Sequence, residues 1–184
     1  MSFSFSNLKI SDVKLVISKH YPDERGYFLE SFKESVFVNN GINTKFVQDN
    51  FSHSTQGVLR GLHYQKNPKA QAKLITAIKG EIFDVAVDIR KNSPTYGKWV
   101  GEILSEKNHK SLFIPEGFAH GFCVISDTAD VLYKVNNEYS PENNAGIIWN
   151  DPDINITWPT DKPLLSEKDL QLPLLCDADN TFEY

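Results

Sequence analysis

Short hydrophobic runs rich in β-branched and aromatic residues recur along the chain, and glycine, proline or asparagine separates them. Runs of this length bounded by turn residues are typical of strands in antiparallel sheets. Their rhythm predicts an all-β protein, built as an antiparallel sandwich or barrel. The predicted strands are residues 13–17, 27–32, 45–49, 58–64, 73–78, 82–89, 99–104, 118–125 and 131–135.

The clearest alternation lies in residues 82–89. Successive side chains of a strand point to opposite faces. The hydrophobic residues at the odd positions therefore share one face, while Asp84, Ala86 and Asp88 share the other. In a small barrel, the face that carries the two aspartates could line the cavity.

Helical signals are few and short. A helix is predicted over residues 33–39, because Asn40 and Gly41 follow it as a stop signal. A further helical turn is predicted over residues 166–170, where Ser166 could act as the cap. We expect both to lie at the periphery of the barrel.

The last quarter of the chain is rich in proline, which favours an extended, loop-like path. We expect this tail to wrap the barrel, either as plain packing or as a carrier of functional groups. The adjacent charges of Lys168 and Asp169 favour the functional role over an ordinary surface pair. No repeat, low-complexity tract or linker divides the sequence, so residues 1–184 are predicted to form a single domain.

Composition excludes several classes of protein. The 184 residues, 40% of them hydrophobic, suffice for one sizeable core. The sequence has no run of about 18 apolar residues and no start that resembles a signal peptide, which predicts a cytoplasmic protein without a membrane segment. The net charge of −5 and the lack of a basic run argue against nucleic-acid binding. Cys123 and Cys176 show no CxxC spacing and are predicted to be reduced and structural.

Two segments, residues 57–65 and 114–122, share a pattern in which a glycine precedes a strand and a histidine follows. They resemble the two boxes of a cupin jelly roll. A metal-binding cupin places a second histidine two residues after the first, and a carboxylate a few residues later. Gln65 takes that second position, and no acidic residue follows before Glu81. Counting ligands therefore predicts no metal site.

His63 is the strongest candidate for acid–base chemistry, because an imidazole titrates near working pH. One ring nitrogen must bind a fixed acceptor, for which Asp84, Asp88 and Asp169 are the candidates. The alternative is a core histidine satisfied by the backbone. On an ideal strand Arg60 would point away from His63, unless the chain bends or bulges at the glycine between them.

Further segments extend the pattern over nearly the whole chain, in order: residues 48–54, 57–65, 80–90, 93–97, 114–122 and 149–152. Together they resemble the dTDP-4-dehydrorhamnose 3,5-epimerase family, whose members are cupin-type sugar-nucleotide epimerases. Several motifs of this length are far more specific than a single histidine. The resemblance implies a cupin-type jelly-roll barrel with short peripheral helices and an extended C-terminal tail.

The resemblance also implies a reaction. A base removes the protons at C3 and C5 of dTDP-4-dehydro-6-deoxy-D-glucose, both acidified by the C4 ketone. Reprotonation on the opposite face gives dTDP-4-dehydro-β-L-rhamnose, a step of dTDP-L-rhamnose biosynthesis that requires no cofactor. Matched by position, His63 is the base, Asp169 its orienting carboxylate and Tyr133 the acid, while Lys73 faces the enolate oxygen. On the residues alone, the favoured interpretation of Tyr133 is a core tyrosine, and Lys73 could be a solvated lysine on a strand.

Substrate contacts and a partner follow from the same resemblance. The resemblance implies a homodimer in which an amino-terminal segment crosses to the partner, so Arg25, Phe28 and Glu30 would serve the neighbouring site. Arg25 and Arg60 suit a pyrophosphate, because a guanidinium offers a planar fork of donors. Tyr139 would stack on the nucleotide base or border the sugar pocket. The implied substrate contacts are Arg25, Phe28, Glu30, Gln48, Asn50, Arg60, His120, Tyr139 and Lys168.

The chain departs from the family pattern at Asn144 and Ala145, where many relatives carry a glutamate–arginine pair, which puts a secondary nucleotide contact in question. Three alternatives stay open. One is a sister epimerase that inverts C3 alone, and the second is a non-catalytic cupin that binds sugar nucleotides. The third is a metal-dependent cupin oxygenase, for which Gln65 in place of histidine is the main obstacle.

Overall fold

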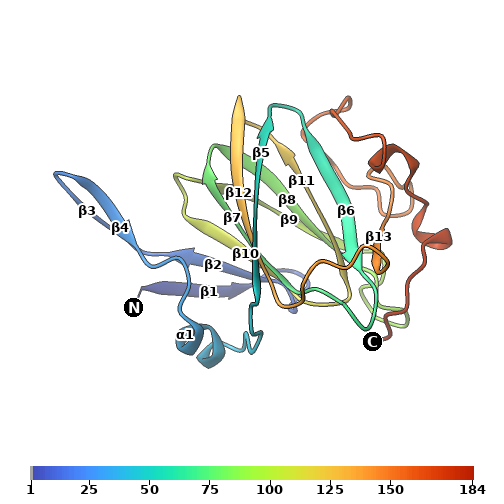
Figure 1. Cartoon of the computed structure of the whole chain (residues 1–184), viewed down its shortest axis with the longest axis horizontal. Helices are drawn as coiled ribbons and strands as arrows, with labels where there is room; N and C mark the ends of the chain where they lie inside the picture. Colours follow the sequence, from blue (N-terminus) through green and yellow to red (C-terminus); the bar gives the residue numbers. More distant parts are fainter. Residues whose placement is uncertain (1) are drawn as a thin grey trace.

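Two antiparallel sheets face each other in the computed structural model, which describes residues 2–184 (Figure 1). The larger has the order β1-β2-β10-β7-β12-β5, and the smaller has the order β13-β6-β11-β8-β9. A separate two-stranded hairpin, β3-β4, projects from the body. The strands are β1 (Phe3–Asn7), β2 (Lys14–Ser18), β3 (His20–Asp23), β4 (Gly26–Leu29), β5 (Gln48–Thr55), β6 (Leu59–Gln65), β7 (Lys73–Lys79), β8 (Glu81–Asp88), β9 (Trp99–Ser105), β10 (Lys110–Ile114), β11 (Phe118–Val124), β12 (Thr128–Val135) and β13 (Asn144–Gly146).

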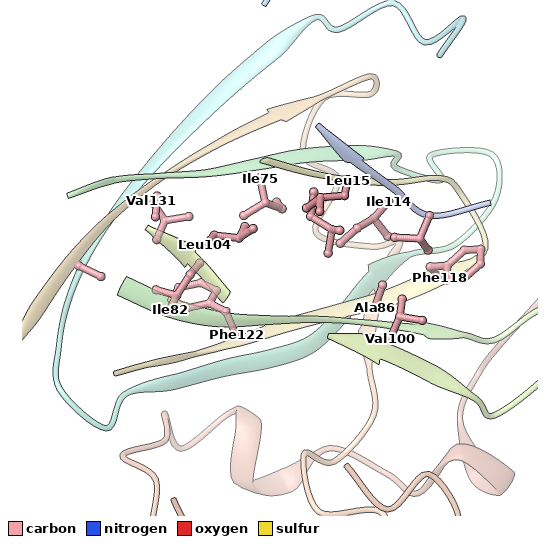
Figure 2. Packing of buried hydrophobic residues seen from close by; sticks show 14 of the residues in the cluster. Leu15, Ile75, Ile82, Ala86, Val100, Leu104, Ile114, Phe118, Phe122 and Val131 are labelled. Atoms are coloured by element: carbon pink, nitrogen blue, oxygen red, sulfur yellow. The ribbon is translucent and has the colours of Figure 1, made fainter. Parts of the chain in front are cut away.

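A hydrophobic cluster fills the space between the two sheets (Figure 2). Ile75 and Val131 reach it from the larger sheet, and Ile82, Leu104 and Phe122 from the smaller one. Burial of such side chains is the main stabilising contribution in a sandwich of this kind. This architecture confirms the predicted all-β, jelly-roll class.

The outer face of the smaller sheet is covered by the C-terminal part of the chain, as predicted (Figure 1). Val85 and Val87 of β8 pack there with Ile154, Trp158 and Phe182. The hydrophobic face of the 82–89 run therefore contacts the tail. Its opposite face, which carries the aspartates, looks into the space between the sheets, as the alternation predicts.

The predicted helix at 33–39 is confirmed as α1 (Glu34–Asn39), which buries Phe37 against the outer side of the larger sheet. The predicted turn at 166–170 is present as well. It leads into a short 3-10 helix, η1 (Asp169–Gln171), and the Oγ of Ser166 accepts the amide of Asp169 at 3.1 Å. A second 3-10 helix, η2 (Leu175–Asp177), follows in the tail.

One predicted strand is misplaced, and four strands were not predicted. The strand expected at 45–49 starts at Gln48 and continues to Thr55. Its inner face is polar and its outer face is mostly exposed, so it carries no hydrophobic alternation. β1, β3, β10 and β13 were missed because they are short, and a strand of three to five residues gives a weak periodic signal.

Among residues 2–184, no helix has the length and hydrophobicity needed to span a membrane. Both cysteines have free thiols, as predicted. Cys123 lies in the core beneath the tail, whereas Cys176 is exposed at the surface and is not a packing residue.

A bulge in β6 determines the directions in which the side chains of Arg60 and His63 point. His63 pairs with His120 of β11, and Arg60 pairs with Phe122, so three steps along β6 oppose two along β11. The extra residue turns Arg60 and His63 to the same side, where both line one cavity. Gly61 lies at this bulge with φ +135°, and a Cβ there would lie 2.5 Å from the Cα of Gly121.

We therefore predict that Gly61→Ala destabilises the protein by roughly 3 kcal/mol or more, since it combines a strained backbone with a clash against β11. Gly57→Ala is the matched control: its φ is also positive, at +76°, but a Cβ there meets nothing within 4 Å. The control should cost only about 1–2 kcal/mol. Urea unfolding of both variants measures the difference, and equal costs would contradict a special role for the bulge.

Candidate active site

A cavity of about 540 Å³ opens at one end of the sandwich, between the two sheets and the tail. Strands β5, β6, β7, β11 and β12 supply side chains to it, and the tail closes one wall. Eight of the residues predicted from the sequence line it together: Asn50, Arg60, His63, Lys73, His120, Tyr133, Lys168 and Asp169.

The Nε2 of His63 lies 2.6 Å from the Oδ1 of Asp169, a residue 106 positions further along the chain. Only 6% of the Asp169 side chain is exposed, against 33% for His63. Burial opposes ionisation of Asp169, but the hydrogen bond and electrostatic interaction with His63, together with the donors from Ser166 and Gly61, hold the pKa of Asp169 below the ordinary value. A carboxylate at Nε2 fixes the tautomer that leaves Nδ1 as the basic nitrogen.

Asp169 is thus the partner of His63 among the three aspartates that the sequence left open. Asp84 lies 2.7 Å from the Nε2 of His120. Asp88 accepts hydrogen bonds from Arg90, Ser93 and Thr95, away from the cavity. Each aspartate therefore has its own partner.

The Asp84–His120 pair is buried, although His120 borders the cavity. Burial lowers the pKa of His120, and the neighbouring Asp84 opposes that shift. Burial likewise raises the pKa of Asp84, and His120 and Lys73 oppose it. The Oδ2 of Asp84 has no hydrogen-bond partner within the described residues 2–184. A buried charged pair of this kind lowers the free energy of unfolding. Buried groups with shifted pKa values are typical of functional sites.

Lys73 supplies a buried cation beside this pair. Its Nζ donates to the carbonyl oxygen of His63 at 3.2 Å. Burial lowers the pKa of Lys73 to about 8, and the charge of Asp84 limits the shift. The ammonium group therefore stays mostly protonated at neutral pH and can stabilise an anion in the cavity.

Tyr133 presents a neutral phenol to the same space. Its hydroxyl lies 2.9 Å from the Oγ of Ser52, and its ring packs against the rings of His120 and Phe122. Burial raises the pKa of Tyr133 to about 12, with the Ser52 hydrogen bond acting in the opposite direction. At neutral pH the phenol holds a proton that it can donate.

The predicted nucleotide-binding residues divide into two groups. Arg60 is held by the Oγ of Ser54 at 3.0 Å. Gln48 donates to Asn50 at 2.6 Å and accepts the backbone amide of Tyr139 at 3.1 Å, which links Tyr139 to the cavity wall. These contacts place the first group around the mouth of the cavity; it comprises Gln48, Asn50, Arg60 and Tyr139.

The second group, Arg25, Phe28 and Glu30, does not reach the cavity of its own chain. Arg25 and Phe28 belong to the projecting β3-β4 hairpin, and Glu30 follows it directly (Figure 1). Arg25 pairs locally with Asp23 at 2.6 Å, and Phe28 is 67% exposed. The fold therefore leaves these residues available to another molecule.

Sequence reasoning missed several residues of the site. Ser52 and Ser54 alternate with Asn50 along β5, and this alternation was the available signal. Asn144, where the chain departs from the family pattern, proves to lie on the cavity wall. The other lining residues that were not predicted as site residues are Val58, Leu59, Gln71, Phe122, Val135, Leu164, Leu165 and Ser166.

This arrangement brings together a base with an orienting carboxylate, a neutral acid and a buried cation. Such a set can remove a proton from a carbon next to a carbonyl, stabilise the enolate and return a proton. Across residues 2–184, His, Cys, Asp and Glu side chains form no group of three or more that could hold a metal ion.

Comparison with known proteins gives consistent matches. A family model described as dTDP-4-dehydrorhamnose 3,5-epimerase matches residues 7–177. A dTDP-4-dehydrorhamnose 3,5-epimerase of Shigella flexneri is 57% identical over 172 residues, which cover 93% of this chain and 95% of that protein. A dTDP-4-dehydrorhamnose 3-epimerase of Streptomyces niveus is 39% identical over 93% of this chain and 83% of its own length.

Solved structures show the same fold. The crystal structure of a dTDP-6-deoxy-D-glucose-3,5-epimerase from Legionella pneumophila, in complex with dTDP-4-keto-L-rhamnose, has a TM-score of 0.92 and 48% identity, covering 95% of this chain and 94% of that one. A 3'-monoepimerase from Streptomyces bikiniensis, in complex with dTDP-quinovose, has a TM-score of 0.87 and 31% identity, covering 92% and 87%.

The buried Lys73 predicts a specific pH dependence of stability. In the folded protein the pKa of Lys73 is about 8, below its ordinary value of 10.5. Above pH 8 the unfolded chain therefore binds more protons at this position, so wild-type stability should rise with pH relative to Lys73→Met. The rise should reach about 1.4 kcal/mol per pH unit.

Urea unfolding of wild type and Lys73→Met between pH of about 7 and 10 measures this difference. Lys79→Met, at an exposed position at the other end of β7, is the matched control and should stay parallel to wild type. A constant difference between wild type and Lys73→Met would show that Lys73 keeps its proton throughout.

Proposed function

The chain belongs to the dTDP-4-dehydrorhamnose 3,5-epimerase family, and from this premise we propose that His63 abstracts the protons at C3 and C5 of dTDP-4-dehydro-6-deoxy-D-glucose. The observation that carries the assignment is the His63–Asp169 pair facing Tyr133 and Lys73 across one cavity. The product is dTDP-4-dehydro-β-L-rhamnose, the substrate of the next step in dTDP-L-rhamnose biosynthesis. The chain acts as an isomerase.

Proton removal begins at Nδ1 of His63. The C–H bond next to the C4 ketone breaks, the proton moves to the imidazole, and the electron pair shifts towards the C4 oxygen as an enolate. Asp169 stabilises the imidazolium through the 2.6 Å hydrogen bond. Lys73 stabilises the enolate, and a buried donor of this kind contributes about 3 kcal/mol to such a transition state.

Inversion requires the proton to return from the other side of the sugar ring. Tyr133 is the acid: its O–H bond breaks, a C–H bond forms at the carbon, and a phenolate remains. Exchange with solvent then returns a proton to Tyr133 and removes one from His63. No external electron donor or acceptor takes part, so the reaction needs no redox cofactor.

The remaining polar residues of the site hold the nucleotide. Arg60 and Lys168 bind the pyrophosphate, since both are cationic side chains that line the cavity. His120 borders the sugar, and Gln48, Asn50 and Tyr139 form a hydrogen-bonded edge at which the base can dock. Asn144 also lines the cavity, where it presents a neutral amide instead of the glutamate–arginine pair that many relatives carry near this position.

We also propose that the chain forms a single domain and acts in the cytoplasm. One continuous cluster of buried residues joins the two sheets, which supports one domain. Two free thiols fit a reducing compartment.

The first test is proton NMR of the substrate in deuterated water with chelator-treated protein. Wild type should replace the hydrogens at both C3 and C5 with deuterium. His63→Ala should slow exchange at both carbons by about 10²–10⁴-fold, because the general base is lost. Tyr133→Phe should retain exchange yet form the inverted product slowly, because only the acid is removed.

The outcomes separate the alternatives. Exchange at C3 alone would indicate the narrower 3-epimerase, and no exchange in protein shown to bind the nucleotide would leave a binding module. Full exchange in His63→Ala would contradict the role of His63, and formation of inverted product at the wild-type rate in Tyr133→Phe would contradict the role of Tyr133.

We further propose a homodimer in which the β3-β4 hairpin of one chain completes the site of the other. The hairpin carries exposed Tyr27 and Phe28. The outer face of the larger sheet exposes Phe51 and Ile78, 62% and 48% accessible. Large exposed hydrophobic side chains on a sheet and on a projecting arm are typical of a protein interface.

A mixing experiment tests the crossed site. Arg25→Ala and His63→Ala homodimers should both be weakly active or inactive. In a heterodimer, the intact His63 of one chain meets the intact Arg25 of the other, so co-expressed variants should recover about a quarter of wild-type activity, given half heterodimers with one working site each.

Light scattering after chromatography measures the dimer directly. A mixture that stays inactive while heterodimers are present would show that Arg25 serves the site of its own chain, and a fully active Arg25→Ala homodimer would show that Arg25 serves no site.

A further inference from the structure

Strand β5 carries a row of polar side chains along its inner face. It is the edge strand of the larger sheet and lies beside β12 (Figure 1). Asn50, Ser52 and Ser54 occupy alternate positions and so share one face. Asn50 lines the cavity, Ser52 contacts Tyr133, and Ser54 contacts Arg60.

The contact between Ser52 and Tyr133 is set by strand pairing. Asn50 lies directly opposite Tyr133 in the β5-β12 ladder, and Ser52 opposite Val131. Ser52 therefore stands one diagonal step from Tyr133, close enough for its Oγ to lie 2.9 Å from the phenolic oxygen. Within residues 2–184, this hydroxyl is the one hydrogen-bond partner of the Tyr133 hydroxyl, while the Tyr133 ring packs against the rings of His120 and Phe122.

We propose that Ser52 is a positioning residue for Tyr133. Ser52 donates its O–H to the phenolic oxygen and thereby directs the O–H of Tyr133 into the cavity. The inference rests on the proposed function. A hydroxyl is both donor and acceptor, and either could donate in this pair. Only the direction from Ser52 to Tyr133 leaves the tyrosine proton free for the substrate.

The same hydrogen bond acts again after the transfer. When Tyr133 gives its proton to the carbon of the enolate, the O–H electron pair stays on the phenolic oxygen as a negative charge. Ser52 then donates to a phenolate, and hydrogen bonds to charged groups are markedly stronger than those to neutral ones. Ser52 thus favours proton delivery by Tyr133 over the return of the original proton from His63.

This competition has a measurable consequence. Return of a proton or deuteron by His63 leaves the configuration unchanged, whereas delivery by Tyr133 inverts it. The ratio of inverted product to total deuterium incorporated reports the division between the two routes. A purely structural role of Ser52 would lower both routes together and leave the ratio unchanged.

The experiment measures this ratio by NMR in deuterated water for wild type and Ser52→Ala. We expect the ratio to fall on the order of tenfold, as for loss of one hydrogen bond to a charged oxygen. Ser52→Thr keeps the hydroxyl and should restore most of it. Ser52→Val has the shape of threonine without the hydroxyl and should match Ser52→Ala, so the Thr and Val pair tests the proposal even where alanine weakens the edge strand.

Ser54→Ala is the matched control on the same face of the same strand. Ser54 holds Arg60, and within residues 2–184 its hydroxyl makes no hydrogen bond with Tyr133, so its loss should raise KM for the nucleotide sugar and leave the ratio unchanged. In a Tyr133→Phe background, Ser52→Ala should have no further effect on the ratio, because the residue through which it acts is already gone.

An unchanged ratio in both Ser52→Ala and Ser52→Val would overturn the proposal, as would an equal fall in the Tyr133→Phe background. These results differ from a failure of the proposed function itself, in which wild type would show neither exchange nor inversion of the substrate.

Discussion

The hydrogen bond between His63 and Asp169 is the interaction on which the rest of the site depends. It joins strand β6 to a tail that begins far away in the sequence, so it exists only when the tail is packed on the smaller sheet. That packing is hydrophobic and involves Ile154, Trp158 and Phe182 against β8 and its neighbours. The burial of apolar surface thus holds in place a carboxylate whose own ionisation burial opposes.

The space between the two sheets holds both hydrophobic packing and the charged groups of the site. Ile82, Leu104 and Val131 fill one part of the space between the sheets (Figure 2), while Lys73, Asp84 and His120 occupy the part beside the cavity. The charged groups are costly there, because burial shifts the pKa of each towards its neutral form. The same water-poor surroundings strengthen the interaction of Lys73 with a developing enolate, so the cost in stability and the gain in catalysis have one origin.

Two departures from regular strand structure build the cavity. The bulge at Gly61 turns Arg60 and His63 to one side, although three positions separate them. The edge strand β5 has a polar inner face where a sandwich would usually have a hydrophobic one, and that face holds Tyr133 and Arg60 through serine hydroxyls. At the other end of the molecule, the β3-β4 hairpin extends away from the body and leaves Arg25 and Phe28 outside the cavity of their own chain.

The sequence by itself determined the all-β class, most of the strands, the helix at Glu34–Asn39 and the residues capable of the chemistry, because alternation, turn residues and motif spacing are local properties of the chain. It did not determine which aspartate meets His63, since Asp84 and Asp88 share a strand with a suitable face and Asp169 lies in a proline-rich tail. Nor did it reveal β5 beyond its first residues, Ser52 or Asn144, whose polar character resembles that of any loop. The tertiary structure decided these points, because hydrogen bonds between distant residues depend on strand register, on one bulge and on where a tail without periodicity packs.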